Sequence, residues 1–199
     1  MKVVCDADGL IKLAKAGILE AFARRVDLLV APTVYREAVE EGKARGHPDA
    51  WEIEQVLREH GRILQPPRGG RTRPQTPEAP AIEALPLGAG ERETWVVFVR
   101  EKADAVLSDD RGFLHALEAQ GIPYLTPAAA LVGLARQGTL SRSEALRALE
   151  RLRPWIRREQ YEAARRDLEA LNGDGDGRER EYEDDGENAD EEGKERSTS

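Results

Sequence analysis

Short apolar runs alternate with segments of helical periodicity along most of this chain, and that alternation strongly constrains the fold. The apolar runs predict five strands, at residues 2–5, 26–31, 62–65, 104–108 and 123–125. The segments between and after them predict helices, at residues 9–25, 32–46, 47–61, 90–102, 110–121, 128–137, 144–152 and 157–171. Strands that alternate with helices are typical of a parallel sheet covered on both faces. We therefore predict an α/β protein, a three-layer α/β/α sandwich around a central parallel sheet, with extra helices at its C-terminal end.

Two segments fall outside this alternation. Residues 66–80 contain five prolines and two glycines, which predicts a loop without regular structure. The low-complexity segment 172–199 contains 12 Asp or Glu and 4 Lys or Arg, and it predicts an acidic disordered tail. We therefore expect one domain over residues 1–155, a C-terminal helix over residues 156–171 and then the tail.

The net charge of −8 belongs to that tail, because the residues before it hold 26 acidic and 26 basic side chains. Any contact with nucleic acid must then come from local basic patches. Candidates are the loop arginines Arg68, Arg71 and Arg73, together with Arg111. The single cysteine, Cys5, excludes a disulfide framework and favours the cytoplasm. The chain has no apolar run near the roughly 20 residues that span a bilayer and no signal-peptide pattern, so we expect no membrane association.

Acidic side chains follow two of the predicted strands. Asp6 and Asp8 come after the first strand, and Asp109 and Asp110 come after the strand at 104–108. Sites in parallel sheets form beyond the carboxyl ends of the strands, so both pairs are expected at the same edge of the sheet. Acids in such places hold a cation or attack a phosphate. An aspartate at a strand end is also frequently only the N-cap of the next helix, and that reading stays open for Asp6 and Asp109.

The opening stretch "VVCDADGLI" resembles the first motif of haloacid dehalogenase-type phosphatases. In such an enzyme Asp6 would be the nucleophile, and Asp8 would protonate the leaving group. The "SDD" stretch would supply the metal-binding acid pair. The resemblance weakens after Gly9, because Leu10 enters an amphipathic helix at once. This phosphatase remains an alternative.

A second resemblance covers more of the chain. The stretches "VVCDADGLIKLAKAG", "APTVYREAVEEG", "LGAGERETW" and "AVLSDDRGF" are similar, in that order, to the acidic motifs of PIN-domain nucleases. The resemblance assigns one catalytic acid to each motif: Asp6, Glu37, Glu91 and Asp110. It extends over about residues 1–155, and "PYLTPAAALVGLARQGTLSRSEALRAL" resembles the C-terminal part of a stand-alone subgroup.

The PIN resemblance implies a metal-dependent endoribonuclease. Oxygen ligands suit Mg²⁺ or Mn²⁺, and the expected metal ligands are Asp6, Glu91 and Asp110, with Asp109 and Asp8 as further candidates. It also implies RNA, single-stranded or structured, as the substrate. A role as the toxin of a type II toxin–antitoxin pair follows for the subgroup, which implies an antitoxin protein as partner and a homodimer.

Several assignments stay open at the level of sequence. Asp8 stands where many family members carry Ser, Thr or Asn, and Glu40 lies one turn from Glu37. The Gly88-x-Gly90 pair is expected to let the chain turn tightly into a helix. Residues 126–152, with the turn "QGTLS", also look like a helix-turn-helix that binds DNA without catalysis, although their leucines indicate packing onto the sheet. A PIN module that binds nucleic acid without cutting it is the remaining alternative.

The three tryptophans are predicted to fill the core, because no pattern of a base-stacking platform surrounds them. They are Trp51, Trp95 and Trp155.

Overall fold

The computed structural model describes residues 1–64 and 87–171, and the predicted proline-rich loop with its three arginines and the predicted acidic tail lie outside this range. The described part contains every predicted strand: β1 (Lys2–Cys5), β2 (Asp27–Val30), β3 (Gly61–Ile63), β4 (Ala105–Leu107) and β5 (Tyr124–Leu125). They form one sheet, in the order β3-β2-β1-β4-β5, in which every pairing is parallel.

The central strand β1 lies between β2 and β4, where the direction of the chain across the sheet reverses. Cys5 pairs with Val30 on one side and with Leu107 on the other, so these three strands end at the same level. The residues that follow β1 and β4, Asp6 and Ser108, therefore lie side by side. A reversal of this kind opens a crevice at the carboxyl edge of a parallel sheet, and ligands bind there in many α/β proteins.

The helices before β3 match the predicted ones, with two differences. They are α1 (Ala7–Ala16), α2 (Leu19–Ala23), α3 (Pro32–Tyr35), the π-helical segment η1 (Arg36–Glu41), α4 (Gly42–Ala44) and α5 (Asp49–His60). The predicted helix 9–25 is divided because Gly17 adopts the left-handed conformation, with φ 68°, and ends α1. The predicted helix 32–46 contains the π segment, a distortion that frequently marks functional sites.

The remaining helices follow the predicted pattern closely. They are α7 (Ala89–Glu101), α8 (Arg111–Ala119), α9 (Pro127–Arg136), α10 (Arg142–Leu152), the 3-10 turn η2 (Arg153–Trp155) and α11 (Arg158–Glu169). Thr126 caps α9, and Ser141 with Glu144 forms a capping box at the start of α10. Among the helices of residues 1–64 and 87–171, none is long and apolar enough to cross a membrane.

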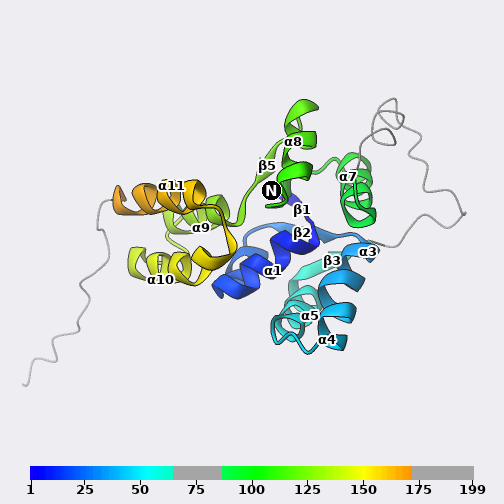
Figure 1. Ribbon diagram of the computed structural model, residues 1–199, viewed down its shortest axis with the longest axis horizontal. Helices are drawn as coiled ribbons and strands as arrows, with labels where there is room; N and C mark the ends of the chain where they lie inside the picture. Colours follow the sequence, from blue (N-terminus) through cyan, green and yellow to red (C-terminus); the bar gives the residue numbers. More distant parts are fainter. Residues whose placement is uncertain (65–86, 172–199) are drawn as a thin grey trace, which may run out of the picture.

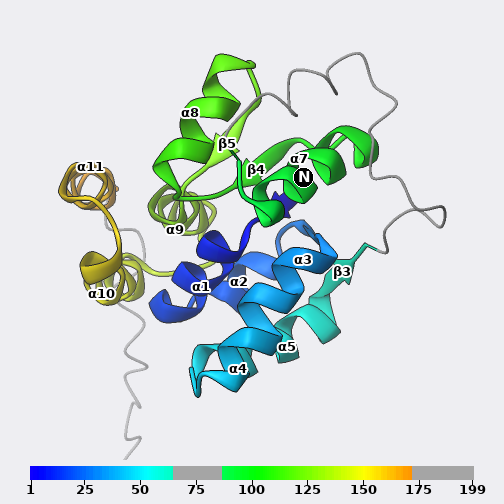
Figure 2. The ribbon, with the colours of Figure 1, turned by 45° about the vertical axis from the view of Figure 1, so that its right-hand side comes forward.

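Helices cover both faces of the sheet (Figures 1 and 2). Successive residues of β4 show this directly, since side chains alternate between the two faces of a strand. Leu107 belongs to the larger hydrophobic cluster, with side chains of α1, α2 and α5. Val106 belongs to the second cluster, with Trp95 of α7 and Phe113 of α8. The predicted three-layer α/β/α architecture is confirmed.

The C-terminal helices α9, α10 and α11 lie together at one side of the sheet, next to α1 (Figure 1). Leu131 and Leu149 are buried, as their spacing indicated. The prediction that α9 and α10 pack onto the sheet was wrong, because their main contacts are with each other, α11, α1 and α2. The buried leucines join a core with α1 and do not leave a free recognition helix.

The predicted burial of the tryptophans is confirmed only for Trp95, which is 1% exposed. Trp51 is 61% exposed and Trp155 is 50% exposed, so the prediction was wrong for both. Each of these two rings has an ammonium group over its face. The Nζ atom of Lys43 is 4.1 Å from the Trp51 ring centroid, and that of Lys15 is 4.4 Å from the Trp155 ring centroid. Cation–π contacts of this kind stabilise an aromatic ring at the surface.

Candidate active site

Asp6 lies at the centre of the carboxyl edge and is only 4% exposed. Its Oδ1 atom accepts a hydrogen bond of 2.6 Å from the backbone N–H of Gly9, which makes Asp6 the N-cap of α1. Its Oδ2 atom accepts a hydrogen bond from the hydroxyl of Ser108, beyond β4. Burial raises the pKa of Asp6 to about 7, because it disfavours the charged form more than these two hydrogen bonds favour it. Asp6 is thus a helix cap that also places a carboxyl group between two strand ends.

Gly9 allows this arrangement because α1 approaches β4 closely. A Cβ atom at Gly9 would lie 2.3 Å from the Leu107 Cδ2 atom and 2.8 Å from the Leu107 carbonyl oxygen. Either contact is too short for any larger residue. The glycine therefore fixes the first turn of α1 against the end of β4.

Glu91 and Asp110 reach the same edge from two other helices. Glu91 lies in the first turn of α7, which begins at the carboxyl edge because it precedes the parallel strand β4; its Oε2 atom accepts a 2.7 Å hydrogen bond from the Gly88 N–H. Asp110 caps α8 through a 2.9 Å hydrogen bond from the Phe113 N–H. Burial raises the pKa of Glu91, and the charge of Asp110 raises it further. The charge of Glu91 in turn contributes to the raised pKa of Asp6, so the three acids form one electrostatic group.

Glu37 lies in the π-helical segment η1 and approaches the start of α7. A Cβ atom added to Gly90 would lie 2.7 Å from the Glu37 Oε2 atom, so the carboxyl group lies directly against this glycine. Burial raises the pKa of Glu37, and the charges of Glu41, Glu93 and Glu91 raise it further. Glu40 is exposed, so the structure favours Glu37 as the acid that faces α7.

The prediction that Gly88 and Gly90 are needed for a tight turn into the helix was wrong. Gly88 has φ −66° and ψ 169°, an extended conformation open to any residue, and Gly90 is not among the glycines with positive φ. The missing side chain of Gly90 instead leaves room for the carboxyl group of Glu37, which a larger residue would displace from its present position. A spacing pattern in the sequence cannot distinguish these two reasons for a glycine.

Asp8 and Asp109 differ from the other acids because both form an ion pair with the same lysine. The Nζ atom of Lys12 lies 2.8 Å from the Asp8 Oδ2 atom and 2.7 Å from the Asp109 Oδ2 atom. Asp109 is buried, and its Oδ1 atom also accepts a 2.5 Å hydrogen bond from Gln160 of α11. Sequence reasoning missed Lys12, although its position four residues after Asp8 was a signal for this ion pair.

Two further polar residues shape the edge and were also missed. Ser108 holds Asp6, and the Ser-x-Asp pattern was its only signal in the sequence. The Glu93 Oε2 atom accepts a 2.8 Å hydrogen bond from the backbone N–H of Thr33, which ties the first turn of α7 to α3. This last contact joins segments 60 residues apart, and no local pattern predicts it.

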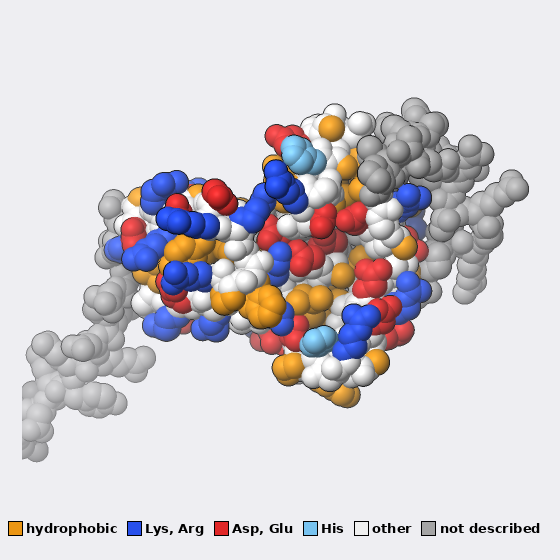
Figure 3. Space-filling model, viewed as in Figure 1, with side chains coloured by type: hydrophobic (Ala, Val, Ile, Leu, Met, Phe, Trp, Pro, Cys, Tyr) orange, Lys and Arg blue, Asp and Glu red, His pale blue; other side chains and the backbone are white. Residues whose placement is uncertain are grey.

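The predicted basic residues are distributed around this edge. Arg111 is the exposed first residue of α8, directly after Asp110, whereas Arg68, Arg71 and Arg73 lie outside the described residues. Figure 3 shows acidic side chains gathered near α1 and below α8, with basic side chains over the C-terminal helices α9–α11.

The residues at the edge fit a hard divalent cation by their chemistry. All the donors are carboxylate or hydroxyl oxygens, which such cations prefer. Thr94, one turn after Glu91 on α7, is fully buried, and its hydroxyl has no hydrogen-bond partner among the described residues. The acids do not form a closed ligand set, since in residues 1–64 and 87–171 no three His, Cys, Asp or Glu side chains are arranged to hold one ion. The edge thus offers suitable donor atoms, and these side chains would have to move closer together to bind one metal ion.

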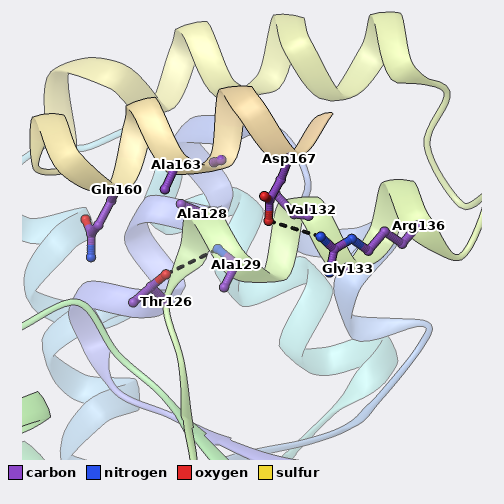
Figure 4. A pocket seen from close by; sticks show the side chains of 10 residues that line it. Thr126, Ala128, Ala129, Val132, Gly133, Arg136, Gln160, Ala163 and Asp167 are labelled. Carbon is purple, nitrogen blue, oxygen red and sulfur yellow. Dashed lines mark hydrogen bonds and ion pairs between the residues drawn. The ribbon is translucent and has the colours of Figure 1, made fainter. Parts of the chain in front are cut away.

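A separate cavity of about 280 Å³ lies between α9 and α11 (Figure 4). Small side chains line most of it, and an ion pair of 3.1 Å joins Arg136 to Asp167 across the two helices. The predicted catalytic acids do not contribute to this cavity. Gln160, which lines it, also bonds Asp109 and so connects α11 to the acidic edge.

Comparison with known proteins gives one match. A family model described as a PIN domain matches residues 2–170, which includes the whole of α9, α10 and α11. No curated protein and no solved structure matches the chain significantly. PIN domains are generally nucleases, and the match supports the second of the two resemblances over the phosphatase. The chain belongs to the PIN-domain family.

Proposed function

We propose that this chain is a metal-dependent ribonuclease that hydrolyses RNA phosphodiester bonds at the carboxyl edge of its sheet. The observation that carries the proposal is that four acids from separate segments lie close enough to affect one another's pKa, with Glu91 acting on Asp6 and on Glu37 and Asp110 acting on Glu91. The buried carboxyl group of Asp6 receives two hydrogen bonds, and no lysine or arginine of the described residues forms an ion pair with it. Negative charge without a protein cation is what a Mg²⁺ or Mn²⁺ site requires.

The chemistry requires a water molecule in line with the scissile bond and stabilisation of the departing oxygen. A bound divalent cation supplies both, since it lowers the pKa of water and clamps the phosphate. Asp6, Glu91 and Asp110 would hold the cation, and Glu37, opposite Gly90, would orient the water. Ser108 and the Gly9 N–H fix the direction of the Asp6 carboxyl group before substrate binds, which lowers the cost of reaching the reactive geometry.

Asp8 and Asp109 have a different role in this proposal. Both are paired with Lys12, and Arg157 also lies 3.9 Å from Asp109, so two cations face these two carboxylates and leave little net charge to attract a metal ion. Their ion pairs instead join the first turns of α1 to the strand end that carries Asp110. We therefore assign them to the support of the site and not to the metal.

The test is a cleavage assay with the full chain and end-labelled RNA and DNA of one sequence, in Mg²⁺, Mn²⁺ or EDTA. We expect RNA cleavage that requires a cation. Asp6→Asn should abolish it while thermal unfolding shows that the fold persists, and Asp8→Asn should retain most of the activity. Equal loss of activity in both variants would contradict the assignment of Asp6 as ligand and Asp8 as support.

The same assay separates the alternatives. A phosphatase would hydrolyse small phosphomonoesters and require Asp8 as well as Asp6. A binding-only module would bind RNA with the affinity of the wild type after either substitution and cleave nothing in either metal. Phosphomonoester turnover that depends on Asp8, with RNA left intact, would overturn the proposal.

We further propose that the ribonuclease acts as the toxin of a toxin–antitoxin pair, as a homodimer with a protein antitoxin. The support is the resemblance of residues 123–149 to the stand-alone subgroup and the match of the family through residue 170. Induced expression in a bacterial host should arrest growth with the wild-type chain and not with Asp6→Asn. Growth arrest by both forms would exclude ribonuclease activity as its cause.

A further inference from the structure

Residues 153–158, with the sequence RPWIRR, connect α10 to α11 and alternate arginines with a tryptophan. Trp155 is 50% exposed, and the Lys15 ammonium lies 4.4 Å from its ring centroid. The side chains of Arg153 and Arg158 are 66% and 85% exposed. Arginines combined with an accessible aromatic ring are typical of surfaces that bind single-stranded nucleic acid.

Hydrogen bonds attach this segment directly to the acidic edge. The backbone N–H of Arg157 donates to Gln160 at 3.2 Å, and the Gln160 amide donates to Asp109 at 2.5 Å. The Arg157 Nη2 atom itself lies 3.9 Å from the Asp109 Oδ1 atom. Asp109 immediately precedes Asp110, so the basic segment begins next to a proposed metal ligand.

Helix α1 fixes the position of the tryptophan from the other side. Lys12 and Lys15 are neighbours on one face of α1, because residues three apart lie about one turn from each other. Lys12 binds Asp109, whereas Lys15 covers the Trp155 ring. Arg151 also donates two hydrogen bonds, of 3.0 and 2.7 Å, to the carbonyl oxygen of Ala16 at the end of α1. Trp155 thus lies against a lysine that is itself roughly one helical turn, about 5 Å along α1, from the lysine that contacts the acidic edge.

A hollow of about 390 Å³ lies at residues that flank the tryptophan in the sequence. Its lining residues are Arg153, Ile156, Arg158, Tyr161 and Glu162. Arg158 pairs with Glu162 at 2.6 Å on the surface, and exposed pairs of this kind contribute little, so a phosphate can replace the carboxylate at small cost. The hollow therefore offers two arginines to an anion, one on each side of Trp155 in the sequence.

We infer that residues 153–158 form a binding subsite for single-stranded RNA, in which Trp155 stacks on a base and the arginines contact the neighbouring phosphates. This subsite rests on the proposed ribonuclease function and specifies its substrate as an unpaired strand, because a base within a duplex is already stacked on both faces. Stacking on an indole accepts any base, so the subsite contributes affinity and position without reading sequence.

The observations favour RNA over a second copy of the chain as the occupant. In a two-fold interface the same patch meets itself, which would bring arginines of both copies together. Like charges in contact are unfavourable, whereas the phosphates of RNA satisfy the same side chains.

The test measures binding of a labelled single-stranded RNA by fluorescence anisotropy, with the full chain carrying Asp6→Asn to prevent cleavage. Trp155→Ala should raise the Kd by roughly fivefold to a hundredfold, and Trp155→Phe should restore part of the affinity. Trp51→Ala is the matched control, because Trp51 is also exposed under a lysine but lies on α5. A duplex of the same sequence should bind with the same Kd to the Asp6→Asn chain with and without Trp155→Ala.

The arginines are tested by salt dependence. Arg158→Ala should weaken binding and lower the slope of log K against log salt by about one, as expected for one lost phosphate contact. Arg142→Ala, at the opposite end of α10, is the control and should leave the slope unchanged.

The outcomes separate the subsite from the ribonuclease function. In the cleaving enzyme, Trp155→Ala should raise KM for single-stranded RNA with little change in kcat. Cleavage by the wild type with identical KM and Kd for Trp155→Ala and Trp51→Ala would overturn the subsite and leave the nuclease intact. A chain that cleaves no RNA but whose affinity depends on Trp155 would retain the subsite and overturn the nuclease. If Trp155→Ala loses a dimer but keeps its affinity for RNA, this patch is a contact between copies of the chain, and the subsite is overturned.

Discussion

The acidic edge and the C-terminal helices differ in how their charges are arranged. Asp6 is buried and has no cationic partner among the described residues, and Glu37 and Glu91 have raised pKa values because of burial. The segment 126–171 instead carries nine arginines against six acids, several of them in exposed pairs four residues apart. The acidic edge therefore consists of residues that are distant in the sequence and that the fold brings together. The arginines of the C-terminal helices instead come from one continuous stretch of sequence. Negative charge that is buried and unpaired requires a ligand, but exposed pairs can exchange partners at little cost.

The largest effect is expected from the acids of the edge. Glu91→Gln should lower RNA cleavage by roughly a thousandfold, because it removes one charged ligand from a site that acts by charge stabilisation. The glutamine can still cap the start of α7, so the fold should persist. Glu40→Gln, an exposed acid one turn from Glu37, is the control for a surface charge and should cleave at the rate of the wild type. A similar loss of RNA cleavage in Glu91→Gln and Glu40→Gln would contradict the claim that the acids of the edge differ in function from exposed acids.

The second prediction concerns pH, and it follows from the burial of Asp6. Its pKa in the folded chain is about 7, above the ordinary 3.8, so between these values the folded protein keeps a proton that the unfolded chain has lost. The contribution of Asp6 to the stability of the folded protein is therefore complete below pH 3.8 and is lost as the pH rises through about 7. The free energy of unfolding falls by roughly 4 kcal/mol at most across this range. Urea unfolding in EDTA should therefore show lower stability at pH 8 than at pH 5.

Asp6→Asn is the control for this pH dependence, since it removes the titrating group. The drop in stability from pH 5 to pH 8 should become smaller in the variant. Mg²⁺ or Mn²⁺ should stabilise the wild type at pH 8 more than the variant, because the cation binds the ionised carboxyl group only when the protein is folded. The same pH slope in both proteins would contradict the burial argument.

A smaller effect is expected at the glycine beside Glu37. Gly90→Ala should lower cleavage by about tenfold, because the new methyl group displaces the Glu37 carboxyl group from a distance of 2.7 Å. Thermal stability should remain or rise slightly, since alanine favours the helix over glycine. Gly88→Ala provides the matched comparison, as its Cβ atom would lie 3.7 Å from the nearest atom, an ordinary contact. Unchanged cleavage in Gly90→Ala would show that the position of Glu37 is unimportant.

The smallest effect is expected from the connection between the two regions. Gln160→Ala removes the hydrogen bond from α11 to Asp109 and the one that Gln160 accepts from the Arg157 N–H, and it leaves the Lys12 ion pair in place. The free energy of unfolding should fall by about 2 kcal/mol, since a typical value is about 1 kcal/mol for each such bond. Gln137→Ala, at the exposed end of α9, should change it by less. If the two variants are equally stable, α11 is held at the edge by other contacts.

Much of the fold could be predicted from the sequence because its signals are local. Alternating periodicity located the strands, and Thr126 and Ser141 marked the helix starts through their own hydrogen bonds. The positions of Asp6 and Asp110 after strands also placed them at one edge, since parallel strands end together. The choice between Glu37 and Glu40 was not local, because it depended on the π-helical segment and on the space left by Gly90.

The sequence by itself determined the order of the elements, the sheet class and the four acidic motifs, because each depends on residues within a few positions of one another. Tertiary structure alone decided which acids have a cationic partner. Lys12 reaches Asp109 across 97 positions and pairs it, whereas burial leaves Asp6 with hydrogen bonds only. It also decided that Trp155 is exposed beside Lys15, since burial depends on the surfaces that meet around a residue and not on its hydrophobicity.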